Sequence, residues 1–169
     1  MLIFEMPVFS FGVLGAIIVA TSNVRVLFLS LYLTFPLTIV VVSATGIARI
    51  SRDNQRQLNV NAIAERLELY YKLHTSAAGR SYPVKQDMQT KAQEVINDNE
   101  ALIAPGKTGN SLVATDTTGE PMVSVSEYVY QVFDADDNIC TSVPCVRFVL
   151  YYRTESDNTV HRVESLHQQ

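Results

Sequence analysis

Hydrophobic and polar positions divide the chain into two parts of different character. Up to position 48 the charged residues are Glu5 and Arg25 alone, whereas charged, polar and apolar residues are mixed from Arg49 onward. Val26–Ala48 is an uncharged, mostly apolar run. It is about as long as the roughly 20-residue helix that crosses a bilayer. The pattern therefore predicts a transmembrane helix at 25–48.

A shorter hydrophobic segment, 1–24, precedes this run and carries Glu5 and Pro7. It lacks the Lys/Arg-rich start of a secretory signal peptide. Two interpretations stay open for it: a second, weaker transmembrane span, which we favour, or a removable leader.

Apolar residues continue at helical spacing after the uncharged run. No proline occurs between Leu37 and Tyr82, so one helix is predicted from about Val26 to His74, with no linker between the membrane segment and the domain. We expect its second half to pack on the domain through an apolar stripe made of Ile47, Ile50, Leu58, Ala62, Ile63, Leu67, Tyr70 and Leu73. The residues expected on its other faces are Arg52, Asp53, Gln55, Arg56, Asn59, Glu65, Arg66 and Glu68.

The rest of the chain predicts a short helix followed by strands. Gln86–Asn97 has helical periodicity, and Asp98–Pro121 is a long loop rich in Gly and Pro. Strands are predicted at Met122–Phe133, Val146–Thr154 and Thr159–Leu166. The expected fold class is α+β: a long N-terminal helix packed on a small antiparallel β-sheet.

Charge and motifs argue against nucleic-acid binding, nucleotide binding and catalysis. The net charge of −4 gives no basic surface for nucleic acid, so no nucleic-acid partner is expected. Gly106-Lys107-Thr108 ends like a phosphate-binding loop, but Ala101 stands where its first glycine would be and Pro105 removes a backbone donor. No serine lies in a nucleophile motif, so we expect neither a catalytic residue nor an enzyme.

The cysteines bear on the side of the membrane on which the domain lies. Cys140 and Cys145, in CTSVPC, suit a small-loop disulfide better than a CxxC redox or zinc motif, and a disulfide favours an oxidising compartment. Two unpaired thiols in a cytosolic domain are the alternative. The positive-inside rule gives two conflicting orientations. Arg25 favours both termini outside the cytoplasm, whereas Arg49, Arg52 and Arg56 favour a cytoplasmic domain.

The order of these segments resembles a known family. Arg49–Pro83 (RISRDNQRQLNVNAIAERLELYYKLHTSAAGRSYP) is similar to the second half of the first helix of type IV pilins and type II secretion pseudopilins, with its tight Tyr-Pro exit. The tail YVYQVFDADDNICTSVPCVRFVLYYRTE is similar to their sheet hairpins with a small cysteine loop. The start departs from the family, because no clear cleavage motif is present and Arg25 stands near the place of the family's glutamate. The resemblance implies a pilin-like extracytoplasmic domain at 49–169.

A calcium site is a further hypothesis. Asp134, Asp136 and Asn138 have the D-x-D-x-N opening of a calcium loop, although Ile139 and Cys145 exclude an EF-hand. Some pseudopilins hold calcium in this region, so the resemblance implies a calcium site at these three residues. The alternative is an acidic turn exposed to solvent. No other cofactor is expected.

Two functions of different classes follow. The first is a structural subunit of a type IV pilus or related secretion or competence filament, anchored in the cytoplasmic (inner) membrane or displayed at the cell surface. Its long helix would pack with other pilin-like subunits or assembly-platform membrane proteins. The alternative is a membrane-tethered extracytoplasmic domain that binds a ligand or ion and forms no filament.

Overall fold

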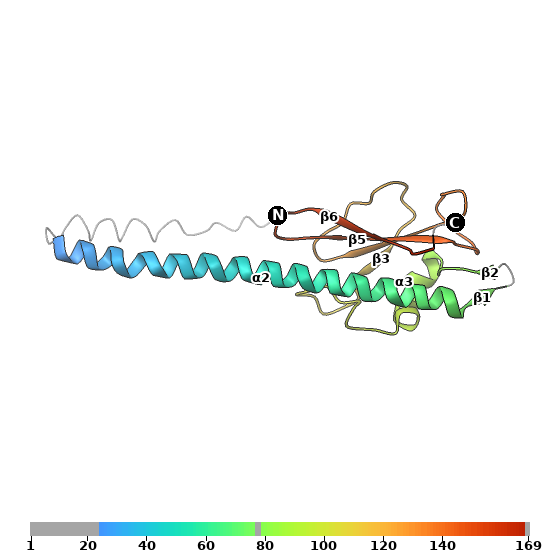
Figure 1. Ribbon diagram of the computed structural model, residues 1–169, viewed down its shortest axis with the longest axis horizontal. Helices are drawn as coiled ribbons and strands as arrows, with labels where there is room; N and C mark the ends of the chain where they lie inside the picture. The colour runs from blue at the N-terminus through green and yellow to red at the C-terminus, as the bar shows by residue number, and fades with distance from the viewer. Residues whose placement is uncertain (1–23, 77–78, 168–169) are drawn as a thin grey trace. The chain divides into compact units, whose positions relative to one another are not determined.

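The computed structural model describes residues 24–76 and 79–167, and the side chains of these except 24–44 and Ser76. The chain divides into two units at the boundary between Gly46 and Ile47, and the second unit, Ile47–Gln169, carries the sheet. Two helices are described, α2 (Val24–Leu73) and α3 (Lys85–Ile96). The continuous helix and the short helix expected from the sequence are thereby confirmed (Figure 1).

In the part of the chain that the structure describes, no helix combines the length and the apolar character that a membrane span requires. The spans expected at 1–24 and 25–48 fall largely on residues outside this description. Residues 1–23 are not described at all, and the side chains of residues 24–44 are not described. They stay predictions.

The main sheet has four strands in the order β3-β4-β5-β6. The strands are β3 (Leu112–Ala114), β4 (Tyr128–Phe133), β5 (Arg147–Arg153) and β6 (Val160–Glu164). β4, β5 and β6 are antiparallel neighbours, but β3 runs parallel to β4. The expectation of a purely antiparallel sheet was therefore wrong, and the sheet is mixed. The parallel strand lies inside the predicted loop and has three residues, too few to show an alternating pattern.

The edge of this sheet at β3 is partly closed by side chains. Asn110 Oδ1 accepts the Leu112 N–H at 2.8 Å, and the Gln89 amide donates to the Ala114 carbonyl at 3.3 Å. These two main-chain groups of β3 are therefore occupied without a further strand.

The remaining differences from the predicted elements are local. The strand predicted from Met122 begins only at Tyr128, because Ser124 and Ser126 form a turn in which the Glu127 N–H donates to the Ser124 carbonyl. A two-stranded ribbon, β1 (Thr75–Ser76) and β2 (Gly79–Arg80), follows α2 where an irregular exit was expected.

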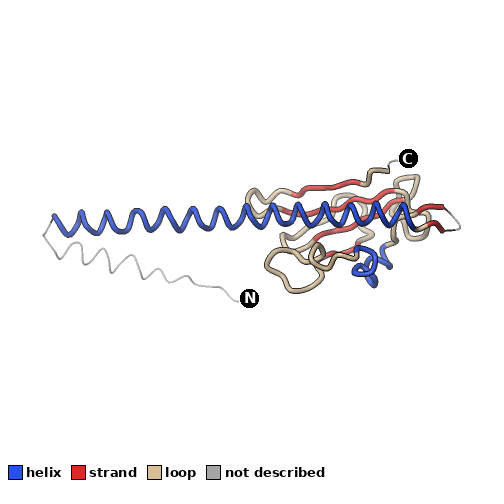
Figure 2. Tube along the Cα trace, turned by 60° about the horizontal axis from the view of Figure 1, so that its bottom comes forward, coloured by secondary structure: helices blue, strands red, loops and turns tan. Residues whose placement is uncertain are grey.

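The second half of α2 lies along the sheet (Figures 1 and 2). Val60, Ile63 and Leu67 enter a core with residues of α3 and of the sheet. The other members of this core include Met88, Ala92, Ile96, Tyr128, Tyr130, Phe148, Leu150 and Tyr152.

The predicted packing stripe of α2 was wrong in half of its members. Ile47, Ile50, Leu58 and Leu73 are exposed, whereas four residues assigned to outer faces are buried: Asp53, Arg56, Asn59 and Glu68. These polar side chains can be buried because protein groups satisfy most of their hydrogen bonds.

Candidate functional site

The outward face of α2 carries a line of exposed apolar side chains. Ile47, Ile50, Leu58, Leu69 and Leu73 are between 44% and 69% exposed. At 3.6 residues per turn these five positions fall within about 140° of the helix circumference, so they share one side of the helix. We call these five residues the outer stripe. Exposed apolar side chains that recur along one side of a helix are a place where another helix can pack.

The opposite face of α2 is fixed to the domain by a buried ionic cluster around Arg56, a residue that is only 1% exposed. The Arg56 guanidinium donates to Asp53 Oδ1 at 2.8 Å, to the Val125 carbonyl at 2.7 Å and to Glu155. Arg52 donates to the same Glu155 carboxylate, with Nη2 at 2.6 Å. One arginine thus joins α2, the loop before β4 and the β5–β6 turn.

Asp53 completes the cluster from the helix side. Its Oδ1 accepts the Glu155 N–H at 2.7 Å, and its Oδ2 accepts the Ser156 N–H at 2.9 Å. Burial alone would raise the pKa of Asp53, but these backbone donors and the Arg56 charge together lower it. Asn59, one turn further on, donates to the Ile103 carbonyl and to the Tyr128 hydroxyl oxygen.

The carboxylate of Glu155 is held ionised by its two arginines. Hydrogen bonds from Arg52 lower its pKa most, partial burial opposes them, and Arg56 lowers the pKa further, to about 2. Each carboxylate of the cluster therefore has a permanent cation beside it, and α2 cannot rotate about its axis without breaking these contacts.

A second polar anchor lies toward the end of α2. Glu68 Oε1 accepts the Tyr82 hydroxyl at 2.9 Å and the Leu166 N–H at 2.8 Å. Burial, and then the hydrogen bond to Glu68, raises the pKa of Tyr82 far above its ordinary value, so the phenol remains a neutral donor. Glu68 thus ties the exit of the helix and the carboxy-terminal segment to one carboxylate.

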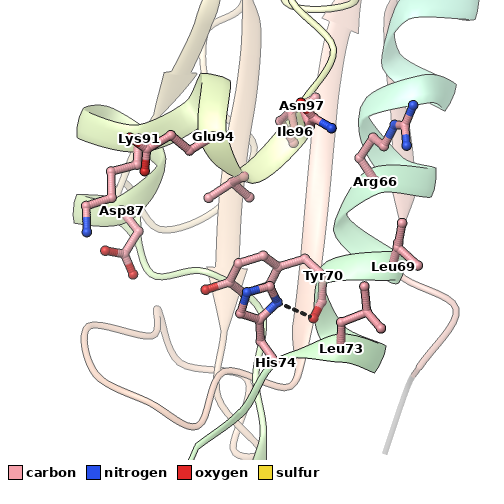
Figure 3. A pocket seen from close by; sticks show the side chains of 11 residues that line it. Arg66, Leu69, Tyr70, Leu73, His74, Asp87, Lys91, Glu94, Ile96 and Asn97 are labelled. Carbon is pink, nitrogen blue, oxygen red and sulfur yellow. Dashed lines mark hydrogen bonds between the residues drawn. The ribbon is translucent and has the colours of Figure 1, made fainter.

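A groove of about 470 Å³ lies between the end of α2 and α3 (Figure 3). On the α2 side, the Tyr70 and His74 rings stack with centroids 3.9 Å apart, and His74 Nδ1 lies 3.1 Å from the Tyr70 carbonyl oxygen. The latter contact agrees with the capping role expected of a histidine at a helix end. Asp87, Lys91 and Glu94 of α3 line the other side. Leu69 and Leu73 belong both to this groove and to the outer stripe.

The predicted disulfide is present. Cys140 and Cys145 are bonded and close a loop whose residues 141–144 are exposed. Cys145 is buried, and its N–H and carbonyl bond the Ser81 hydroxyl at 2.8 Å and the Tyr82 N–H at 2.9 Å. The loop is therefore attached at its base to the segment that leaves α2.

The three residues of the calcium hypothesis lie in one turn between β4 and β5. Asp134 Oδ1 accepts the N–H groups of Asp136 and Asn138, both at 2.9 Å, and the neighbouring Asp137 pairs with Arg147 at 2.7 Å. In the part of the chain that the structure describes, no three His, Cys, Asp or Glu side chains are grouped so as to hold a metal ion. Calcium binding here stays a prediction.

Comparisons with protein-family models, with curated proteins and with solved structures gave no match to this chain.

Proposed function

We propose that this chain is a membrane-anchored, pilin-like structural subunit of a type IV pilus or related secretion or competence filament. The observation that carries the proposal is the outer stripe, which places exposed apolar side chains along one side of α2 while the Arg56 cluster holds the other side on the domain. Such a helix offers other subunits, or a membrane protein of an assembly platform, a rigid surface for side-by-side packing.

The sequence of the first 48 residues supports the membrane anchor. Val26–Ala48 has no charged residue and continues without proline after Pro36 into the domain, in accordance with the single helix α2.

The disulfide supports an extracytoplasmic location of the domain, whether the protein is anchored in the inner membrane or displayed at the cell surface. Disulfides persist in oxidising compartments and are rare in the cytosol. The proposed role is structural rather than enzymatic, and it needs neither a cofactor nor nucleic acid.

Site-specific cross-linking tests the packing surface. Both native cysteines are in the disulfide, so an introduced cysteine is the single free thiol of the chain. We expect Leu58→Cys in the membranes of intact cells to give disulfide-linked dimers on mild oxidation. Ala135→Cys, at another exposed position, in the β4–β5 turn, is the control and should give none. Equal yields from both variants, or no dimer from Leu58→Cys, would contradict helix packing.

The same control variant tests localisation. A membrane-impermeant maleimide should label Ala135→Cys in intact cells before any lysis. Labelling that requires lysis would place the domain in the cytoplasm and remove the filament proposal.

The groove in Figure 3 favours the second candidate, a tethered ligand-binding domain that forms no filament. Its stacked Tyr70 and His74 rings and mixed charges suit a small polar molecule with an apolar part. This candidate predicts monomers in the cross-linking experiment and a loss of ligand binding in Tyr70→Ala.

Calcium at Asp134, Asp136 and Asn138 would serve either function by stiffening the β4–β5 turn. Millimolar calcium should then raise the melting temperature of the wild-type chain and not that of Asp136→Ala. An unchanged melting temperature of the wild-type chain, with and without chelator, would exclude the site.

A further inference from the structure

A smaller hollow of about 350 Å³ lies beside the groove of Figure 3. The hollow and the groove share four lining residues: Tyr70, Leu73, His74 and Asp87. Residues 81–83 and Val143 of the disulfide loop lie on the side of the hollow away from the groove. Its volume falls within the roughly 300–1,000 Å³ in which proteins bind small molecules.

The charge of this hollow comes from Asp87. It is the one acidic residue among the described residues that line the hollow, and no lysine or arginine is among them. In the described part of the chain, its carboxylate forms neither a hydrogen bond nor an ion pair. Asp87 stands in the first turn of α3, where the helix dipole favours the ionised carboxylate. Lys91, one turn further on, lines the larger groove but not the hollow, so the hollow carries an uncompensated negative charge.

Two aromatic rings lie next to this carboxylate. The Tyr70 and His74 rings are nearly parallel, at 10°, with centroids 3.9 Å apart. The Tyr70 hydroxyl points toward the Asp87 carboxylate in Figure 3. Burial raises the pKa of Tyr70, and the Asp87 charge raises it further, in agreement with their proximity. Aromatic faces attract cations, so the rings and the carboxylate favour the same sign of charge.

His74 contributes a hydrogen-bond acceptor as well as a ring. Its Nδ1 lies 3.1 Å from the Tyr70 carbonyl oxygen, and a carbonyl oxygen can only accept, so Nδ1 carries the hydrogen of this contact. The neutral ring therefore leaves Nε2 as an acceptor. An ammonium group has three N–H donors and no acceptor, which complements a carboxylate beside a free imidazole nitrogen.

We propose that this hollow binds a small organic cation, an ammonium group on a short alkyl chain. The ammonium group lies at Asp87 beside the two rings, and the alkyl chain covers Leu73 and Val143, which are 69% and 49% exposed. The assignment rests on the ligand-binding candidate described above and specifies the class of its ligand.

Three probes of similar size and different charge test the assignment: butylammonium, 1-butanol and butyrate. Each is titrated into the full-length chain in a nonionic detergent, because zwitterionic head groups are themselves organic cations, and amide NMR shifts are followed. We expect butylammonium to shift the amides of residues 70–75 and 85–89 and to bind about tenfold more tightly than 1-butanol. Butyrate should bind most weakly.

Two variants of α3 make the test specific. Asp87→Asn should lower the affinity for butylammonium about tenfold, to that of 1-butanol, and leave the affinity for 1-butanol unchanged, which shows that the hollow is intact. Glu94→Gln, the matched control, removes an acidic group that lines the larger groove but not the hollow, and should keep the preference for the cation.

The possible failures are distinguishable. Equal affinities for the three probes would overturn the cation assignment and leave the ligand-binding candidate standing. No shift from any of them would overturn the assignment and count against that candidate as well. Tighter binding of a lysine peptide blocked at both ends than of butylammonium would overturn the small-molecule ligand in favour of a partner's lysine side chain.

Discussion

Two buried carboxylates of α2 hold distant parts of the domain in similar ways but differ in their cations. Asp53 accepts backbone N–H groups of the β5–β6 turn, and Glu68 accepts a backbone N–H of the carboxy-terminal segment. Asp53 has the buried Arg56 beside it, and both of its oxygens are hydrogen-bonded. Glu68 has His167, and one of its oxygens has no hydrogen-bond partner among the described residues.

The difference shows that one helix can be attached to a domain through two kinds of contact. An arginine keeps its charge at every physiological pH, so the carboxylates of the Arg56 cluster have a permanent cation beside them. The hydrogen bonds that Glu68 accepts come instead from neutral donors, the Tyr82 hydroxyl and the Leu166 N–H.

The largest effect should come from removing the permanent cation. Arg56→Met leaves Asp53 and Glu155 buried or half-buried beside an uncharged side chain, and we expect a loss of about 3–5 kcal/mol in the free energy of unfolding. The chain has no tryptophan, so denaturant unfolding can be followed by tyrosine fluorescence. Arg66→Met, at an exposed position of the same helix, should change the free energy by less than about 0.5 kcal/mol. Similar losses in the two variants would show that the cluster contributes no more to the free energy of unfolding than an exposed side chain does.

Removing the disulfide tests the support on the Glu68 side. The Cys140→Ser/Cys145→Ser double variant frees a short loop whose base bonds Ser81 and Tyr82, and should lose about 2 kcal/mol. Because Tyr82 donates to Glu68, exchange at Leu166 should increase more than exchange around Asp53. Uniform changes at both anchors would mean that the loop acts on the domain as a whole.

Acid should weaken the permanent attachment by a smaller amount. The pKa of Glu155 is lowered to about 2, so its contribution is present above the ordinary glutamate pKa of about 4.3 and is lost as pH falls from there toward 2. Allowing for the 20% of this side chain that stays exposed, we expect a loss of about 1–2 kcal/mol over that interval. Unfolding curves of Glu155→Gln should show a shallower dependence; an identical slope would assign the acid sensitivity to other groups.

The smallest effect on stability is expected at the outer stripe. Leu58→Ser replaces a side chain that is already 62% exposed, so the free energy of unfolding should change by less than about 0.5 kcal/mol. Under the proposed function, association with neighbouring copies should nevertheless fall, as measured by the cross-linking yield from Ile50→Cys in the same background. A large loss of stability would show that Leu58 packs inside the domain.

The sequence predicted elements better than it predicted faces. Helix α2, helix α3 and strands β5 and β6 lie within a few residues of their predicted bounds, because propensity and turn signals are local. Ile47 and Leu58 were assigned to the core although they are exposed. The apolar pattern misled here because Asp53 and Arg56 reach the core by pairing with residues about 100 positions away.

The polar anchors themselves could not be located from the sequence. Glu68 looks like any glutamate on a helix, and nothing near it in the chain indicates Tyr82, Leu166 or His167 as its partners. The disulfide was predictable, since Cys140 and Cys145 are close in the chain and are the only cysteines. Contacts between neighbours in sequence were thus accessible to prediction, and contacts across the fold were not.

The partly closed edge at β3 has a consequence for crowding at a surface. A sheet edge with free N–H and C=O groups can recruit strands of other molecules and begin uncontrolled aggregation. Here Asn110 and Gln89 occupy two of those groups, on a strand of only three residues. Under the proposed function, copies that meet through their helices would find at this edge little template for joining their sheets.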